Sequence, residues 1–187
     1  MYSMEIMKTD TINNVNFNAK YIDKAIIRKR TGFFYRPYKA SIVALDRFDS
    51  ADKKAIETIA SDWGNRTVIR TILLDPIPKN EHIIAITTQN KKTCENIDPK
   101  SILALAQYNE QGRKKIILSR FQVNPVTKYA SELKREYKKV GETLLEKIKQ
   151  IKYKRKLKLE STVEGVPFYE KYGFKHERDS YYSMYCD

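Results

Sequence analysis

The chain contains few of the residues that build disulfide frameworks or metal centres. Its 187 residues include two cysteines, Cys94 and Cys186, and two histidines, His82 and His176. Neither pair has the short spacing of paired thiols or zinc ligands, so the sequence favours neither a disulfide framework nor a metal site. We therefore expect a reducing compartment, no metal cofactor, and histidines that are structural or exposed.

Several familiar catalytic and targeting patterns are also missing. The six glycines form no phosphate loop ending in Gly-Lys-Ser/Thr and no GxGxxG fingerprint, and no G-x-S-x-G nucleophile elbow occurs. No apolar run approaches the ~20 residues of a membrane span, and the first residues lack a basic segment followed by an apolar core. These absences argue against secretion and membrane insertion, so we expect a cytoplasmic protein.

Acidic residues are scarce relative to basic ones. The chain has 36 lysine and arginine residues against 23 aspartates and glutamates, which gives a formal charge of +13. Such an excess attracts anions at long range. RNA, a ribosome, a phosphorylated cofactor and an acidic protein all fit this charge, and so does a well-solvated surface.

The basic excess is mixed with aromatic residues in the first 39 positions. Rings and cations are interleaved there, as Phe33, Phe34, Tyr35 and Tyr38 beside Arg28, Lys29, Arg30 and Arg36. Cationic side chains bind phosphates and rings stack on bases, so this segment suits a nucleic-acid face. It equally suits a strand edge or an arm that packs its rings on a core. We therefore distinguish residues 1–39, which pack on or extend from the core, from a domain of residues 40–187.

The middle of the chain predicts a helix and an antiparallel meander. Apolar runs rich in strand formers predict strands at residues 40–45, 82–88, 101–108 and 116–123. Asn109 to Gly112 has turn chemistry suited to a hairpin between the last two strands. Apolar residues at three- and four-residue intervals from Ala51 to Trp63 predict a helix that Gly64 ends. Residues 68–74, which run into two prolines, predict a short strand or a linker.

The stretch from Lys114 to Phe174 adds a strand, a helix, a second strand and a short aromatic helix. The first strand is closed by Asn124-Pro125, and the second covers residues 157–161. The helix between them places five apolar residues on one face, namely Val140, Leu144, Leu145, Ile148 and Ile151. Joined to the meander, this βαβα unit predicts a single α/β (α+β) domain with a mixed, largely antiparallel central sheet flanked by helices.

The start of that helix has the features of an anion site. The octet from Lys138 to Leu145 combines free backbone N–H groups at the positive end of a helix dipole with two lysines and Gly141. A glycine lets another group approach the backbone closely, so the octet suits a pyrophosphate. The alternative is a plain amphipathic helix with solvated lysines.

The order of these segments resembles the GNAT superfamily of acyl-CoA-dependent N-acetyltransferases. The strand of residues 116–123 resembles the family's central strand, and the octet resembles its cofactor loop and helix. The most specific match is to the family's carboxy-terminal signature, at residues 161–174 (STVEGVPFYEKYGF). The chain departs from the family's loop pattern, Q/R-x-x-G-x-G/A, because Glu136 stands where Gln or Arg is usual and Lys139 where the first glycine is usual.

The resemblance implies how acetyl-CoA would bind. In the family the pantetheine arm lies along the central strand like an added strand, which here would use main-chain groups of Phe121, Gln122 and Val123. The pyrophosphate would accept hydrogen bonds from five backbone N–H groups, those of Lys139, Val140, Gly141, Glu142 and Thr143. Lys138, Lys139 or Arg135 would add positive charge.

The resemblance also implies two candidate catalytic residues. Tyr169 matches the tyrosine that in many relatives stands near the thioester sulfur, where it acts as a general acid and protonates the departing thiolate. The alternative is a buried tyrosine whose hydroxyl is satisfied elsewhere. Glu160, near the end of the second strand, is a candidate general base, although strand alternation can equally point it to solvent.

The resulting hypothesis is an acetyl-CoA-dependent N-acetyltransferase in which an amine attacks directly within a ternary complex. Its amine acceptor is unidentified and would bind among the first helix, residues 65–80 and residues 126–138. The alternative is a basic RNA- or ribosome-associated binding module on a GNAT-like scaffold with little or no catalysis. An intermediate hypothesis is an enzyme whose acceptor sits on RNA or on a ribosomal protein. A homodimer is compatible with all three.

Overall fold

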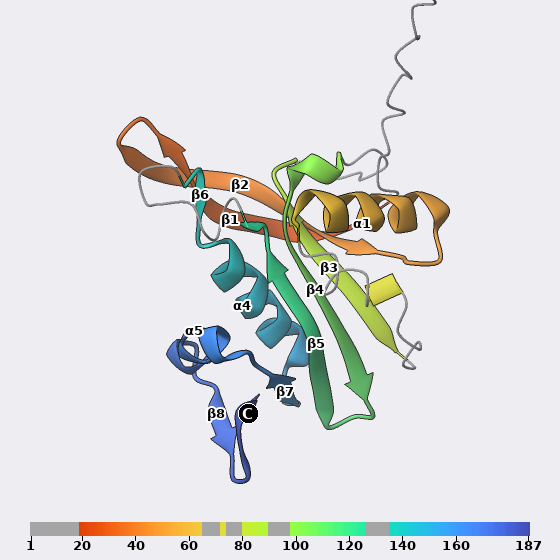
Figure 1. Ribbon diagram of the computed structural model, residues 1–187, viewed down its shortest axis with the longest axis vertical. Coiled ribbons are helices and arrows are strands. Elements are labelled where there is room, and N and C mark those ends of the chain that lie inside the picture. Colours follow the sequence, from red (N-terminus) through yellow and green to blue (C-terminus); the bar gives the residue numbers. More distant parts are fainter. Residues whose placement is uncertain (1–18, 65–71, 74–79, 90–97, 126–134) are drawn as a thin grey trace, which may run out of the picture.

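The chain forms a nine-stranded sheet with helices packed on both faces (Figure 1). The computed structural model describes residues 19–64, 72–73, 80–89, 98–125 and 135–187. In these residues the strand order is β6-β1-β2-β3-β4-β5-β7-β9-β8, and β5 with β7 is the one parallel pair. The predicted fold class, a mixed and largely antiparallel sheet flanked by helices, is therefore confirmed.

Most of the secondary-structure elements are strands, and few are helices. The strands are β1 (Lys20–Thr31), β2 (Phe34–Leu45), β3 (Glu81–Thr87), β4 (Ile102–Gln111), β5 (Lys115–Val123), β6 (Tyr137–Lys138), β7 (Lys156–Glu160), β8 (Lys175–Glu177) and β9 (Ser180–Cys186). The helices are α1 (Ser50–Asp62), α4 (Val140–Lys152) and α5 (Val166–Lys171), with short 3-10 turns η1 (Pro99–Ser101) and η2 (Val163–Gly165). Within the described ranges, no helix combines the length and the apolar character that a membrane crossing requires.

Most predicted elements are present, with ends that differ from the prediction. The five predicted strands correspond to β2, β3, β4, β5 and β7, and the three predicted helices to α1, α4 and α5. The predicted turn at residues 109–112 is shifted, because Asn109 and Glu110 still pair with β5 and the left-handed turn residue is Gly112, with a φ of 64°. Of the predicted strand or linker at residues 68–74, all but two residues lie outside the described part. The strands β6, β8 and β9 were not predicted.

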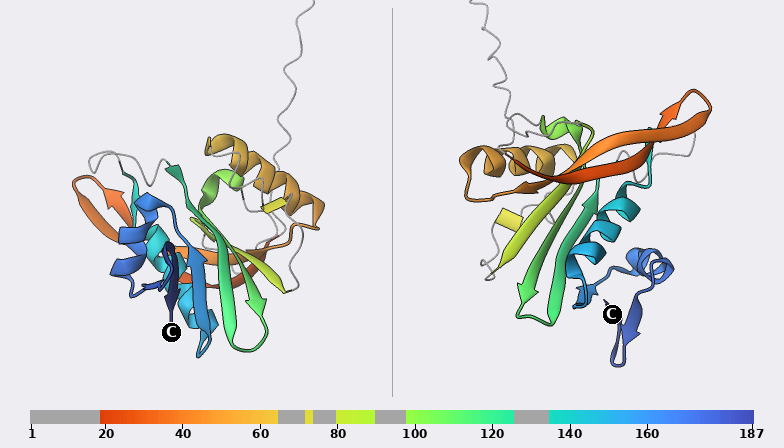
Figure 2. Two further views of the ribbon diagram at one scale, coloured as in Figure 1. Left: turned by 60° about the horizontal axis from the view of Figure 1, so that its bottom comes forward. Right: turned by 180° about the vertical axis from the view of Figure 1, so that it is seen from behind.

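The sheet has two cores, one on each face (Figure 2). α1 covers one face and packs Ala55, Ile56 and Ile59 against residues of β2, β3 and β4. The side chain of Asp49 caps this helix by accepting hydrogen bonds from the backbone N–H groups of Ala51 and Asp52. Trp63 closes the end of this core with 7% of its surface exposed.

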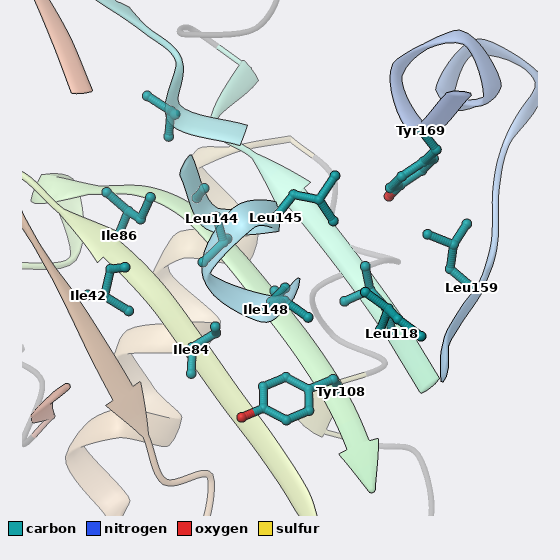
Figure 3. Close-up of a cluster of buried hydrophobic side chains, with 14 of the residues drawn as sticks. Ile42, Ile84, Ile86, Tyr108, Leu118, Leu144, Leu145, Ile148, Leu159 and Tyr169 are labelled. Carbon is teal, nitrogen blue, oxygen red and sulfur yellow. The ribbon is translucent and has the colours of Figure 1, made fainter. Parts of the chain in front are cut away.

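α4 and α5 cover the other face and build the larger core (Figure 3). Four apolar residues of the predicted helix face are buried, namely Val140, Leu144, Leu145 and Ile148, while Ile151 is partly buried. They pack on Ile42, Ile84 and Ile86 of β2 and β3 and reach Leu159 of β7. The apolar spacing in the sequence thus correctly identified the face of α4 that faces the sheet.

The described residues of the N-terminal segment belong to the sheet. β1 and β2 form a long antiparallel hairpin that pairs from Lys20↔Ala44 to Thr31↔Phe34. The boundary that we placed between residues 39 and 40 falls inside β2, so the described residues before it share the sheet with those after it. Figure 1 shows the hairpin extending beyond the body of the molecule.

A buried ion pair joins the loop before α1 to the start of β3. One guanidinium nitrogen of Arg47 lies 2.9 Å from a carboxylate oxygen of Glu81, and the two side chains are 5% and 7% exposed. Another Arg47 nitrogen donates to the backbone carbonyl of Ile72. A buried charge that loses its partner keeps its desolvation penalty, so this pair makes the two elements interdependent.

We expect Glu81→Ala to lower the free energy of unfolding by about 3–5 kcal/mol, because it removes one partner of a buried ion pair while the buried charge of Arg47 remains. Urea denaturation followed by circular dichroism measures the change. The double variant Arg47→Met with Glu81→Leu should recover most of the loss, since it removes both charges. A double variant as unstable as the single one would contradict this account.

Candidate functional site

The parallel strands β5 and β7 separate before β5 ends. Their pairing runs from Lys115↔Lys156 to Leu118↔Leu159 and stops there. β5 continues from Ser119 to Val123, and its last four residues remain paired with β4 on the other side. Alternate backbone groups of a strand point to opposite edges, so part of the N–H and C=O groups in this stretch points toward the side that β7 has left. We call residues 119–123 the β5 edge.

A β-bulge accompanies the separation. The register between β4 and β5 shifts between Gln107 and Tyr108, so Ser119 has no residue directly opposite it in β4. The amide of Asn109 donates to the Ser119 hydroxyl over 3.2 Å and holds the bulged residue. A bulge bends its strand and increases the local twist, which turns the β5 edge away from β7.

The first turn of α4 lies against the β5 edge. A Cβ atom built on Gly141 would be 3.0 Å from the Val123 side chain and 3.7 Å from the rings of Phe121 and Phe168. A contact of 3.0 Å is too tight for an ordinary side chain, so glycine lets the helix start this close to the strand. Gly141 therefore brings the predicted anion site next to the strand whose main-chain groups we predicted to bind the pantetheine arm.

The N-terminus of α4 has no side-chain cap. Lys139 is the N-cap residue and makes no capping hydrogen bond, and its backbone is left-handed, with a φ of 66°. The N–H of Thr143 donates to the carbonyl of Lys139. The N–H groups that precede Thr143 in the first turn therefore point out of the end of the helix, where an anion binds favourably.

α5 supplies an aromatic cluster on the same side of the sheet. Phe121 of the β5 edge lies 6.0 Å from Phe168 and 6.2 Å from Tyr169, measured between ring centroids. Tyr169 also packs edge-on against Phe168 and Phe174. Strand, helix start and aromatic helix, which are far apart in the sequence, thus meet around Phe121.

Tyr169 is the polar group of this cluster. Its side chain is 8% exposed and lies in the core under α4, with the hydroxyl directed away from α5 (Figure 3). Burial alone raises the pKa of Tyr169, and none of the described residues contributes a hydrogen bond to that shift. The phenol is therefore protonated at neutral pH and keeps a hydrogen available for donation.

Three of the other predicted cofactor residues have side chains that contact other groups of this chain. The ammonium of Lys138 lies 4.3 Å above the ring of Tyr35 in the β1–β2 hairpin. The hydroxyl of Thr143 donates to the carbonyl of Ile26 in β1, over 3.4 Å. The amide of Gln122 donates to the carbonyl of Val123, over 3.1 Å. Lys138 and Thr143 thus tie the helix start to the hairpin through their side chains.

Two acidic residues at the helix start are also engaged. Glu142 lies 3.5 Å from the ammonium of Lys139. Burial, together with a hydrogen bond from Tyr172 to Glu142, raises the pKa of Tyr172 to about 12. Glu136, at the position where the family pattern has Gln or Arg, lies 3.6 Å from the ammonium of Lys29. These carboxylates are thus held by neighbouring groups of this chain.

Glu160 lies at the end of β7 and is exposed. Leu157 and Leu159 are buried in the core that contains Tyr169. Because successive residues of a strand point to opposite faces, the side chain of Glu160 leaves the sheet on the side away from that core. The structure therefore does not bring Glu160 together with Tyr169.

Sequence reasoning missed the role of Phe168 and the strand β6. We expected Phe168 to be a core residue, and it does pack against the larger core, but its ring also contacts the position of Gly141 and packs on Phe121. β6 pairs Tyr137 and Lys138 with β1, and the N–H of Arg30 donates to the carbonyl of Glu136 over 2.8 Å. A two-residue strand has no periodicity of its own, so no local signal could have revealed it.

His176 secures the C-terminal hairpin to α5. Its two ring nitrogens lie 2.9 Å from a Glu170 carboxylate oxygen and 2.7 Å from the carbonyl of Tyr181. The hydrogen bond to Glu170 raises the pKa of His176, because both acceptors favour the doubly protonated ring. With both nitrogens engaged, this histidine is a structural residue.

No protein-family model matches the chain, and no curated protein matches it by sequence. Solved structures match it by fold. Ard1 from Thermoplasma volcanium is 15% identical over 79% of this chain and 96% of its own, with a TM-score of 0.51. Tetrahymena GCN5 is 12% identical over 88% and 95%, with a TM-score of 0.50. An acetyltransferase of the GNAT family from Staphylococcus aureus Mu50 is 12% identical over 78% and 96%, also with a TM-score of 0.50.

The left-handed backbone of Lys139 makes a testable difference to stability. A residue with a side chain in this conformation destabilises the folded state by about 1–2 kcal/mol. Glycine avoids this strain, but it also increases the conformational entropy of the unfolded chain, which offsets part of the gain. We expect Lys139→Gly to raise the free energy of unfolding by about 0.5–1 kcal/mol in a denaturant titration. Lys139→Ala is the matched control, because it removes the same charge but keeps a Cβ atom. Equal stabilities of the two variants would contradict the strain at this position.

Proposed function

We propose that this chain, which has the fold of the GNAT N-acetyltransferases, transfers an acetyl group from acetyl-CoA to an amine. The observation that carries the proposal is the meeting of three elements around Phe121. They are the β5 edge with its backbone groups, the uncapped start of α4, and the buried hydroxyl of Tyr169. Each has a property that an extended, phosphorylated thioester requires.

The described residues fit acetyl-CoA in two respects. An extended amide-bearing arm can bond to the β5 edge as an added strand would, because β7 no longer occupies that side. The pyrophosphate then reaches the first turn of α4, since Gly141 places this turn against Val123 at the end of the same edge. The two binding elements therefore follow each other in the order that the cofactor's arm and pyrophosphate require.

The departures from the family's loop pattern are compatible with this binding. Lys139 replaces a glycine, yet it adopts the left-handed backbone that a glycine would favour. The N–H groups that follow it are therefore still presented at the end of the helix. Glu136 is held by Lys29, so its negative charge is partly offset by a neighbouring cation.

The bound cofactor would supply an acetyl group already activated as a thioester. The chain's own contribution would be positional: the β5 edge and α4 would fix the reacting carbonyl, and a bound amine would attack it directly in a ternary complex. The new C–N bond forms as the C–S bond breaks, and the amine gives up one proton. No covalent intermediate on the protein is required.

Tyr169 would act at the sulfur. Its raised pKa keeps the phenol protonated, so a proton is in place when negative charge develops on the departing thiolate. A free thiol ordinarily has a pKa of about 8.5, below that of this phenol. Tyr169 would therefore stabilise the sulfur mainly as a hydrogen-bond donor, and any proton that it passed to the thiolate would be replaced by the proton that the amine gives up.

The acceptor remains an amine of unassigned class. Residues 65–80 and 126–138, in which we expected the acceptor to bind, lie mostly outside the described part of the chain. Glu160 points away from the core that contains Tyr169. We therefore propose that a group other than this carboxylate accepts the proton of the attacking amine.

Binding of acetyl-CoA is the direct test of this function. We expect acetyl-CoA at about a hundredfold excess over its Kd to stabilise the protein by about 2.7 kcal/mol and to raise the melting temperature by roughly 5–10 °C. ATP at the same concentration is the control, because it carries comparable charge without the pantetheine arm. No shift, or an equal shift with ATP, would overturn the proposal.

Tyr169→Phe should reduce turnover about 100-fold or more while leaving acetyl-CoA affinity unchanged, because it removes only the donor at the sulfur. Release of free CoA, followed with a thiol reagent over a panel of peptides and small amines, measures turnover. Glu160→Gln should leave turnover within the same order of magnitude as that of the unmodified protein. A collapse of activity in Glu160→Gln, with Tyr169→Phe unaffected, would reverse the two assignments.

A further inference from the structure

The outer face of the β1–β2 hairpin carries a row of cations. Paired residues of neighbouring strands point to the same face of a sheet, and the register pairs Ile26↔Lys39 and Arg28↔Pro37. β6 extends this row, because Lys138 pairs with Arg28 from the other side. We define the basic face as Lys24, Ile26, Arg28, Arg30, Pro37, Lys39 and Lys138.

The basic face is exposed and lies on the side of the sheet opposite the larger core, which α4 covers. Lys24, Arg28 and Lys39 are exposed, and 58% of the surface of Ile26 is accessible. The alternate residues of the hairpin, such as Ile27 and Ala40, are buried on the other face under α4. α1 covers the same side of the sheet from Val43 onward, and the hairpin extends past it (Figure 1).

Charge is concentrated in this hairpin. Residues 20–39 contain seven lysines and arginines but a single acidic residue, Asp23. Asp23 forms an ion pair with Lys147 of α4, on the side of the main core. The hairpin thus has a net charge of +6, nearly half of the chain's +13, and its one carboxylate is already engaged.

Two like-charged pairs stand directly across from each other in neighbouring strands. Arg28 pairs with Lys138 on the basic face, and Lys29 pairs with Arg36 on the opposite face. Like charges in directly opposite positions destabilise a sheet. Lys29 has Glu136 as a partner, whereas Arg28 and Arg36 form no ion pair with the described residues. An anionic ligand on the basic face would offset the repulsion between Arg28 and Lys138.

The tip of the hairpin adds two exposed rings. Phe33 follows Gly32 in the turn, and Phe34 is the first residue of β2; they are 91% and 73% exposed. Phe34 pairs with Thr31, so its ring leaves the hairpin on the face opposite the basic face. Exposed aromatic side chains of this size are unfavourable in water unless another group covers them. Rings next to a cationic strip are the combination with which proteins bind the bases and the backbone of a single strand.

We propose that the basic face and the hairpin tip bind single-stranded nucleic acid. The phosphates would follow the cations from Lys24 to Arg30. Where the strand passes around the tip, unpaired bases would stack on Phe33 and, on the opposite face, on Phe34. The shared chemistry of RNA and single-stranded DNA is sufficient for this contact, because the rings and cations read no sugar hydroxyl.

The distribution of charge favours a strand over a lipid surface. A membrane-docking tip would gather its cations beside the inserted rings, whereas these cations continue along β1 to Lys24, eight positions before the turn begins at Gly32. Alternate residues of a strand are about 6.6–6.8 Å apart, so Lys24, Arg28 and Arg30 form an extended track. A linear polyanion can contact all of them together.

This proposal is independent of acetyl transfer. The side chains of Arg28, Lys39, Phe33 and Phe34 have no part in the proposed cofactor site, so their variants should bind acetyl-CoA normally. Lys138 belongs to both regions and is therefore left unchanged in the experiment.

The test measures fluorescence anisotropy of labelled 15-nucleotide oligouridylate and oligothymidylate with the full chain at about 50–200 mM salt. The unmodified protein should bind both, with an affinity that falls steeply with salt. Arg28→Glu with Lys39→Glu should weaken binding at least tenfold and lower the slope of log affinity against log salt by about 2. Lys53→Glu with Lys54→Glu, on exposed positions of α1, has the same change in net charge and should weaken binding far less.

A second variant separates stacking from charge. Phe33→Ala with Phe34→Ala should weaken binding about tenfold with an unchanged salt slope, because it removes rings and no cation. Circular dichroism and the acetyl-CoA thermal shift confirm that each variant is folded. Equal losses in the hairpin and α1 charge variants would overturn the proposal. So would binding to phosphatidylserine vesicles that depends on the two phenylalanines while oligonucleotide binding does not.

Discussion

The separation of β5 from β7 after Leu118 and Leu159 is the constraint on which the rest of the site depends. The bulge at Ser119 produces it locally by adding one residue to β5 that β4 does not match. If the strands stayed paired, β7 would use the backbone groups of the β5 edge. The ring of Phe121 would also lose its place beside Phe168 and Tyr169. One local irregularity thus creates both the free β5 edge and the position of Tyr169 beside it.

The start of α4 is held from two sides. Gly141 brings it against Val123 of β5, and β6 joins the residues before it to β1 at the opposite edge of the sheet. The proposed pyrophosphate site and the basic face therefore share one short strand, in which Tyr137 packs against Tyr38 of the hairpin. The two proposed sites therefore adjoin each other at β6.

Local patterns predicted most of the fold, because their physical causes are local. The apolar spacing of α4 identified its buried face, and the aromatic run at residues 168–174 identified a short helix packed on the sheet. The same reasoning missed β6 and underestimated β1, since a basic strand at the edge of a sheet has no continuous apolar alternation. One of its pairing partners, β2, is the next strand in the chain, but the other, β6, lies far away in the sequence, outside any local window.

The sequence by itself determined the fold class, the order of strand, helix, strand and aromatic helix, and the residue types available at the site. Helix and strand periodicities and the glycine at position 141 are properties of neighbouring residues, so they could be read directly. Only the tertiary structure decided which groups meet. It turned Glu160 away from Tyr169, gave Lys139 a left-handed backbone, and aligned the cations of β1, β2 and β6 on one face. These outcomes depend on strand register and on packing between distant segments, which are set by the whole fold rather than by any local pattern.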